Sequence, residues 1–208
     1  MVVPVMVTDP RHPQILAWLV AHEHGFLVPE LTAYSVIADL AVIDTDEMRA
    51  YEIKSSGDSL KRLPHQVMGY GRIFDRFTLV AAENQLRRLE KMEESFAVLP
   101  EWAGVMVVSE HGIEELRPAS PNPDVCPQIL AAMLWQDEAV AELRARGMET
   151  PRRRWESAHA LSEAIPIDEL RSVVRTRLKA RNWTTRPPLR AGDEPTLRKN
   201  PAIVKETP

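Results

Sequence analysis

The spacing of apolar residues changes from a helical period to a strand period near the start of the chain. Four apolar residues recur at the spacing of one helix face and predict a helix over residues 13–24, namely Ile15, Leu16, Leu19 and Val20. Gly25 ends this helix. Apolar runs separated by turn residues then predict three strands, over residues 26–31, 36–43 and 48–55.

Helices and strands continue to alternate over the next part of the chain. The polar loop 56–59 offers N-cap residues to a helix expected over residues 60–74. The remaining patterns predict a strand at 77–82, a helix at 85–94 and a strand pair at 102–109 and 113–117. The predicted fold class is therefore α/β, an αβββαβ core in which helices flank a mixed sheet.

The pattern becomes wholly helical after a proline-rich stretch at 118–123. We expect helices over residues 128–145, 153–165 and 168–181. These patterns divide the chain into a core over 1–120, a helical extension with a basic face over 121–183, and a flexible tail rich in proline and polar residues over 184–208.

Composition indicates a soluble globular protein, because 44% of the 208 residues are hydrophobic and 27% are charged. No apolar run approaches the roughly 20 residues that a membrane helix needs, so no membrane partner is expected. The single cysteine, Cys126, cannot form an internal disulfide, which suits the reducing cytoplasm. The sequence leaves the oligomeric state open, a dimer included.

Charge is distributed unevenly along the chain. The formal net charge is −4, yet residues 151–208 carry 13 Lys and Arg against 7 Asp and Glu. The rest of the chain is therefore strongly acidic. An acidic body with a basic C-terminal segment is typical of a protein whose partner is a phosphate backbone, here nucleic acid.

The chemistry centres on a carboxylate in an apolar strand. Asp39 lies in the middle of the predicted strand 36–43, where burial is costly unless the carboxylate is paired or binds a metal. In the returning strand, alternation places Glu52 and Lys54 on one face. A short turn joins the two strands, so we expect an antiparallel hairpin that brings Asp39 near Glu52.

Phosphodiester cleavage needs such a group of side chains. Carboxylates can hold a hard divalent cation, which stabilises charge on the phosphoryl oxygens and lowers the pKa of a bound water. A lysine beside them can position or deprotonate the attacking water, or stabilise the developing charge. The residues alone do not choose among these roles for Lys54.

The same residues resemble a known superfamily. Ala38-Asp39-Leu40, thirteen positions before Glu52-Ile53-Lys54, is similar to the motif of the PD-(D/E)XK, or restriction-endonuclease-like, nucleases, although their proline is replaced by Ala38. The string over 51–70, with Leu99-Pro-Glu-Trp-Ala-Gly104 and Met133-Leu-Trp-Gln-Asp-Glu138, resembles a branch of small, mostly uncharacterised bacterial and phage proteins.

This resemblance implies an αβββαβ core, Mg²⁺ or Mn²⁺ as cofactor, and hydrolysis of DNA, less often of RNA. It implies Asp39, Glu52 and Lys54 as catalytic residues, with Asp39, Glu52 and the main chain of Ile53 in the metal shell. An upstream glutamate often completes that shell in similar nucleases. Glu30 is the candidate here, with Glu23 as its rival.

Two helices carry candidate residues for nucleic-acid binding. Arg62, Gln66 and Tyr70 share one face of the helix after the motif. The resemblance implies that Gln66 and Tyr70 position the substrate, and Arg62 is a candidate phosphate contact; an ordinary solvated face is the alternative. On the last helix, a basic face could bind the phosphate backbone or be the outer side of a packed helix; its residues are Arg171, Arg175 and Lys179.

Three functions follow from these patterns. The leading hypothesis is a metal-dependent nuclease that hydrolyses phosphodiester bonds, preferentially in DNA. The second is a nuclease-like module that binds nucleic acid without cutting it. The third is an interaction protein in which the sheet is only a scaffold and no divalent metal binds.

Overall fold

A computed structural model of the chain describes residues 12–93 and 98–183. The tail predicted over 184–208 lies outside the described residues. Within them the elements are α1 (His12–His22), β1 (Phe26–Ala33), β2 (Val36–Ile43), β3 (Met48–Lys54), α2 (Leu63–Gly71), β4 (Arg76–Ala82), α3 (Glu83–Glu93), β5 (Gly104–Ser109), β6 (Gly112–Arg117), α4 (Pro127–Ala131), α5 (Gln136–Ala145), α6 (Arg154–Ala164) and α7 (Ile167–Ala180).

The strands form one mixed sheet in the order β1-β2-β3-β4-β5-β6. The first three strands pair antiparallel, β4 lies parallel to both β3 and β5, and β6 returns antiparallel to β5. Helix α2 makes the crossover that the parallel β3–β4 pair requires. The α/β fold and the predicted αβββαβ element order are therefore confirmed.

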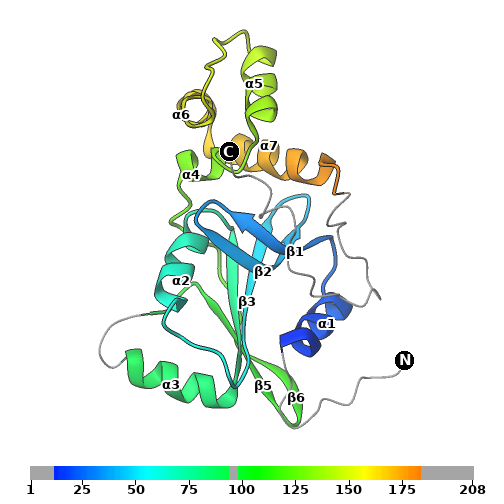
Figure 1. The fold of residues 1–208 in the computed structure, drawn as a ribbon, viewed down its shortest axis with the longest axis vertical. Coiled ribbons are helices and arrows are strands. Elements are labelled where there is room, and N and C mark those ends of the chain that lie inside the picture. Colours follow the sequence, from blue (N-terminus) through cyan, green and yellow to red (C-terminus); the bar gives the residue numbers. More distant parts are fainter. Residues whose placement is uncertain (1–11, 94–97, 184–208) are drawn as a thin grey trace, which may run out of the picture.

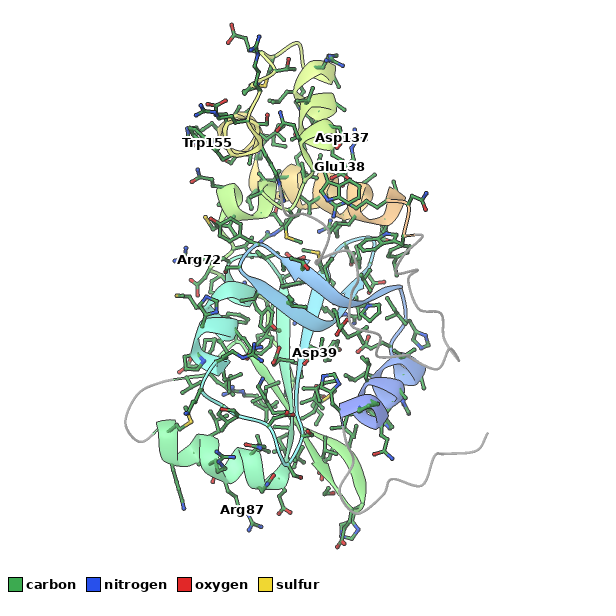
Figure 2. The ribbon with its side chains drawn as sticks, viewed as in Figure 1. Asp39, Arg72, Arg87, Asp137, Glu138 and Trp155 are labelled. Carbon is green, nitrogen blue, oxygen red and sulfur yellow. The ribbon has the colours of Figure 1, made fainter. Side chains whose placement is uncertain are left out.

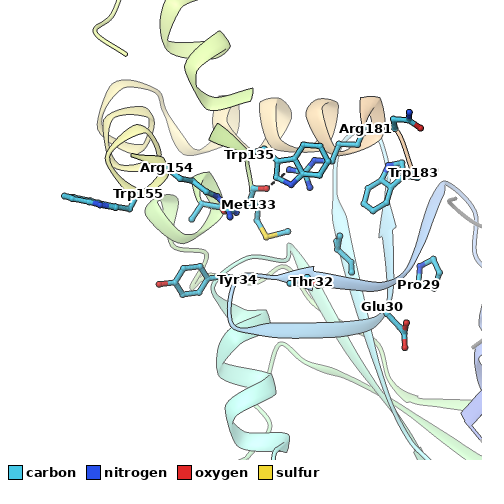
Figure 3. Close-up of a pocket in the computed structure, with 13 residues that line it drawn as sticks. Pro29, Glu30, Thr32, Tyr34, Met133, Trp135, Arg154, Trp155, Arg181 and Trp183 are labelled. Atoms are coloured by element: carbon cyan, nitrogen blue, oxygen red, sulfur yellow. Dashed lines mark hydrogen bonds between the residues drawn. The ribbon is translucent and has the colours of Figure 1, made fainter. Parts of the chain in front are cut away.

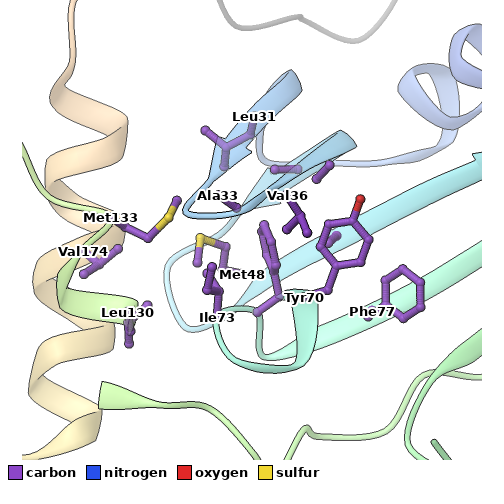
Figure 4. Packing of buried hydrophobic residues seen from close by; sticks show 14 of the residues in the cluster. Leu31, Ala33, Val36, Met48, Tyr70, Ile73, Phe77, Leu130, Met133 and Val174 are labelled. Atoms are coloured by element: carbon purple, nitrogen blue, oxygen red, sulfur yellow. The ribbon is translucent and has the colours of Figure 1, made fainter. Parts of the chain in front are cut away.

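Helices cover both faces of the sheet (Figure 1). Helix α1 packs on one face through a small apolar cluster that contains Leu16, Leu40 and Ile53. Helix α2 packs on the other face, where a larger cluster extends without a break from the strands into the C-terminal helices. Figure 4 shows Met133, in the turn between α4 and α5, close to the strand residues Ala33 and Met48, and Val174 of α7 belongs to the same cluster.

Two predicted helices differ from those in the structure. Helix α2 begins only at Leu63, because Asp58 accepts hydrogen bonds from Ser55 and keeps the preceding loop in a turn. The helix predicted over 128–145 is two helices, α4 and α5. The main-chain N–H of Trp135 donates to the carboxylate of Glu138 at 2.7 Å, which starts a new helix after the break.

No helix in the described ranges has the length and apolar character needed to cross a membrane.

Candidate active site

Strands β1 and β2 both change the direction of their side chains at one point. Even-numbered residues of β2 pack on the α2 side as far as Ala38 and on the α1 side from Leu40 onward. The ladder between the strands pairs the residues on either side of Glu30 and Asp39, so these two lie opposite each other. Glu30 has a φ of 47°, in the left-handed region. The irregularity turns two carboxylates out of an otherwise regular pleat.

Asp39 lies at the centre of the molecule, where β2 separates from β3 (Figure 2). The β2–β3 ladder ends at the pair formed by Leu40 and Tyr51. Beyond it, the Asp39 carboxylate accepts the main-chain N–H of Ile53 at 2.7 Å. This side chain therefore replaces a main-chain acceptor of the ladder, which fixes Asp39 next to β3.

Glu52 is buried, and its carboxylate accepts hydrogen bonds from three side chains. Its Oε1 accepts from Lys54 Nζ at 2.5 Å and from Gln66 Nε2 at 2.6 Å. Its Oε2 lies 2.5 Å from the hydroxyl of Tyr70. Strand alternation correctly predicted that Glu52 and Lys54 lie side by side, and helix periodicity correctly predicted that Gln66 and Tyr70 share a face. Roles for Gln66 and Tyr70 in substrate binding stay predictions.

Burial perturbs the titration of this group. Desolvation raises the pKa of Glu52, and the negative charge of Asp39 raises it further. Lys54 and Tyr70 act in the opposite direction without cancelling the rise. Burial and the adjacent Glu52 charge likewise raise the pKa of the Tyr70 hydroxyl. A raised pKa on one of two crowded carboxylates is expected from the predicted placement of Asp39 near Glu52.

His12 is a site residue that sequence reasoning missed. Its Nε2 lies 3.2 Å from Oδ1 of Asp39. Burial lowers the pKa of His12, but the hydrogen bond and charge of Asp39, with the charges of Asp58 and Glu52, raise it above its ordinary value. A lone histidine at a helix start carries no pattern that points to a strand so far along the chain.

A cavity of about 510 Å³ joins these side chains. Its lining includes the predicted residues Glu30, Asp39, Glu52, Ile53, Lys54, Arg62 and Gln66. His12, Asp58 and His65 also line it and were not predicted. Glu23, the rival of Glu30, instead binds Arg49 at 3.0 Å and accepts a hydrogen bond from the hydroxyl of Tyr51, on the other face of β3. The geometry therefore favours Glu30 as the third carboxylate.

The donor atoms of this cavity suit a hard cation only in part. Mg²⁺ is usually held by one or two carboxylates together with water molecules. Asp39 and Glu52 could supply these carboxylates. Across the described ranges, however, no three His, Cys, Asp or Glu side chains are grouped closely enough to hold a metal ion. Both Glu52 oxygens also accept hydrogen bonds within the protein. Metal binding at this point would need Glu52 to exchange at least one of them.

The predicted basic face of α7 packs against the turn between β2 and β3 and against the residue that precedes β4. Arg171 forms an ion pair with Asp75 at 2.9 Å, and Arg175 is buried, donating to the main-chain oxygen of Thr45 at 3.1 Å. Lys179 reaches the main-chain oxygen of Asp44 at 3.3 Å. These contacts fit the packing alternative, and nucleic-acid binding by the three residues stays a prediction.

The fold and the cavity together define a mixed α/β protein with a buried carboxylate–lysine cluster. The chain belongs to the bacteriophage P4 protein cII family, whose model matches residues 14–191. Among solved structures it is weakly similar to the SPO1766 protein of unknown function from Silicibacter pomeroyi. The identity is 22% and the TM-score 0.40, and the match covers 64% of this chain and 88% of that chain. No curated protein matches it.

Proposed function

We propose that the protein is a divalent-metal-dependent nuclease that hydrolyses phosphodiester bonds in DNA, with Mg²⁺ or Mn²⁺ as cofactor. The observation that carries this proposal is the meeting of Asp39, Glu52 and Lys54 in one cavity. The resemblance of these residues to the PD-(D/E)XK motif, set on an αβββαβ order of elements, supports it. The single cysteine is consistent with action in the cytoplasm.

The position of each residue in the cavity supports a role in the proposed reaction. Asp39 and Glu52 would hold the cation, with the main chain of Ile53 and the carboxylate of Glu30 beside them. The cation, when bound, would neutralise charge on the scissile phosphate and lower the pKa of an attacking water.

The remaining polar groups act on these ligands and on the substrate. Lys54 Nζ would position the attacking water or stabilise the developing negative charge. Gln66 contacts both Glu52 and Lys54 and so keeps their relative position. Arg62 is exposed at the cavity and is placed to contact a phosphate of the substrate.

One observation favours a second function, a nuclease-like module that binds nucleic acid or another partner without cutting. The Glu52 carboxylate is fully engaged by Lys54, Gln66 and Tyr70. A carboxylate with such partners is stable without a metal. The two functions differ in one measurable property, the cleavage of DNA in the presence of a divalent cation.

The test is incubation of the protein with labelled linear, circular and branched DNA, and with RNA, in Mg²⁺, Mn²⁺ or EDTA. We expect DNA cleavage that EDTA stops and that Asp39→Ala and Glu52→Ala abolish. Asp46→Ala is the matched control, because Asp46 is an exposed acid on the turn between β2 and β3. Absence of cleavage on every substrate, or wild-type cleavage by Asp39→Ala, would contradict the nuclease proposal.

A further inference from the structure

A second, larger hollow lies between β1 and the C-terminal helices (Figure 3). Its volume is about 660 Å³, within the range typical of ligand pockets. Aromatic and arginine side chains dominate its lining, and we name it the aromatic groove after Tyr34, Trp135, Trp155, Trp183, Arg154 and Arg181. Figure 3 shows Tyr34 and Trp155 toward one end of the groove and Trp183 toward the other.

Three of the four rings of this groove are exposed to solvent, whereas Trp183 is partly buried. The exposed fraction is 62% for Tyr34, 49% for Trp135 and 60% for Trp155. Large apolar residues gathered on one surface mark interaction sites in soluble proteins. The guanidinium of Arg181 lies over the ring of Trp135, 4.3 Å from its centroid, and fixes the orientation of the ring. A ring fixed in this way is a preformed platform for stacking.

Positive charge accompanies the rings. Arg154 donates to the main-chain oxygens of Leu134 and Ala132, groups that carry no formal charge. Its own charge is therefore available to an anion at the groove. Arg181, by contrast, is paired with the carboxylate of Glu138 at 2.7 Å and serves to fix Trp135. Flat rings next to a cationic side chain favour a ligand with both aromatic faces and phosphates.

The groove adjoins the candidate active site, because one residue lines both. Glu30 lines both the aromatic groove and the cavity that holds Asp39, Glu52 and Lys54. A polymer bound in one hollow can therefore extend into the other along β1. A small isolated ligand would gain nothing from this continuity, whereas a polynucleotide strand would be held on both sides of Glu30.

We infer that the aromatic groove binds an unpaired DNA strand that runs to the active-site cavity, its bases stacked on Tyr34, Trp135 and Trp155. This inference rests on the proposed nuclease function. Bases in a duplex stack on one another, so only an unpaired strand can offer base faces to the rings. Arg154 would meet its phosphates. The inference makes DNA with a single-stranded segment the preferred substrate class.

The experiment measures fluorescence anisotropy of labelled oligonucleotides of about 12 nucleotides in EDTA, so that binding is separated from cleavage. The probes are single-stranded DNA, the same sequence as duplex, and single-stranded RNA. We expect tightest binding to single-stranded DNA, and an affinity about ten-fold lower in both Tyr34→Ala and Trp155→Ala. Trp155→Phe should recover most of the loss, because it restores a ring.

Leu116→Ala is the matched control, because Leu116 is a large apolar residue on β6 with 56% of its surface exposed, and it does not line the groove. Its affinity for single-stranded DNA should equal that of the wild type. Wild-type affinity in Tyr34→Ala and Trp155→Ala would overturn the inference. Tighter binding to duplex DNA or to RNA would overturn it as well. A third result would also overturn it. If Tyr34→Ala and Trp155→Ala change the oligomeric state in solution but not the affinity for DNA, the groove is a contact between copies of the chain.

Asp39→Ala separates this inference from the nuclease proposal. It should bind single-stranded DNA like the wild type and fail to cut it. If the wild type cleaves no substrate but loses affinity for DNA when the rings are removed, the inference about the groove stands and the nuclease proposal is wrong. If the wild type cleaves DNA but the ring variants bind DNA with wild-type affinity, the nuclease proposal stands and the inference about the groove is wrong.

Discussion

The hydroxyl of Tyr70 on α2 lies 2.5 Å from Oε2 of Glu52 on β3. The same hydroxyl lies 2.7 Å from the main-chain oxygen of Ile37 on β2. A phenol has one proton, so the Tyr70 hydroxyl shares it between the Glu52 carboxylate and the Ile37 oxygen. One hydroxyl thus ties two strands to the helix that covers them.

Replacing Tyr70 by phenylalanine should therefore destabilise the protein. Tyr70→Phe leaves the buried Glu52 carboxyl and the Ile37 oxygen with one partner fewer, while the ring keeps its packing on Phe77 at 5.0 Å. We expect the free energy of unfolding in urea to fall by about 1–3 kcal/mol. Tyr34→Phe is the control, since the Tyr34 side chain is exposed, and should change it by less than about 0.5 kcal/mol. Equal effects of both substitutions would contradict this assignment.

Local patterns in the sequence are sufficient to predict the element order and the placement of Glu52 beside Lys54. Alternation along 48–55 places Glu52 and Lys54 together, because side chains two positions apart in a strand share a face. The same rule fails in β2, where the side chains change face at Asp39. That change depends on Glu30 and Asp39 lying opposite each other, and a pairing between strands is not encoded in the pattern of either strand alone.

Contacts between distant segments were the parts that could not be predicted. His12 reaches Asp39 from the first helix, and the aromatic groove brings Tyr34 together with Trp155. The break before Trp135 was missed because apolar residues keep a helical spacing across it, while the chain ends one helix and starts another. Each feature depends on tertiary packing, which periodicity does not report.

Acid should weaken the contact that Glu138 of α5 makes with Arg181 at the end of α7. Burial tends to raise its pKa, but the hydrogen bonds from Arg181 and from the N–H of Trp135, with the charges of Arg181 and Arg177, lower it below the ordinary 4.5. A carboxyl group with a lowered pKa in the folded state contributes stability above its ordinary pKa and loses it as the pH falls through the lowered value. Glu138→Gln should therefore cost about 1–3 kcal/mol at neutral pH. The difference from wild type should vanish in urea titrations at progressively lower pH.

Asp137→Asn is the control for this experiment, because Asp137 is the exposed neighbour of Glu138 in the first turn of α5. Its effect should stay below about 1 kcal/mol, the usual size of an interaction with the helix dipole. A Glu138→Gln penalty that persists unchanged into acid would show that shape, and not charge, is what the carboxylate contributes.

Arg175 decides between the two interpretations of the basic face on α7. The residue is buried, and it contacts Asp75 at 3.7 Å and the main-chain oxygen of Thr45. We expect Arg175→Ala to lower the free energy of unfolding by about 1–3 kcal/mol and to leave the salt dependence of DNA binding unchanged. Arg62→Ala, at the exposed rim of the cavity, should instead reduce the log–log salt slope by about 0.7–0.9. A similar reduction in Arg175→Ala would show that Arg175 contacts phosphate.

Lys54 tests the chemical part of the nuclease proposal. Lys54→Met keeps a long side chain beside Glu52 but removes its charge and its donors. We expect DNA cleavage in single-turnover assays to fall at least about 10²-fold, the usual effect of losing a group that stabilises developing charge. Mn²⁺ should still bind in calorimetry, because Asp39 and Glu52 remain. Lys61→Met, on the exposed loop before α2, should cut at the wild-type rate. Loss of Mn²⁺ binding in Lys54→Met would reassign the lysine to holding the carboxylates.

Glu30 offers the most direct test of the metal shell, because a matched residue stands four positions away. Glu30 and Tyr34 both have left-handed backbone conformations, with φ values of 47° and 56°. Such a conformation costs a non-glycine residue about 1–2 kcal/mol, which glycine relieves while adding about 0.5–1 kcal/mol of conformational entropy cost. Glu30→Gly and Tyr34→Gly should therefore both stay within about 1 kcal/mol of wild-type stability.

Only Glu30→Gly removes a carboxylate from the cavity that contains Asp39 and Glu52. We expect it to weaken Mn²⁺ binding several-fold and to slow DNA cleavage, whereas Tyr34→Gly should bind Mn²⁺ like the wild type. Calorimetric titration of both variants at one pH gives the comparison, and their similar backbone change excludes strain as the cause of a difference. Equal Mn²⁺ affinity in Glu30→Gly and the wild type would remove Glu30 from the metal shell and leave Asp39 and Glu52 as its carboxylates.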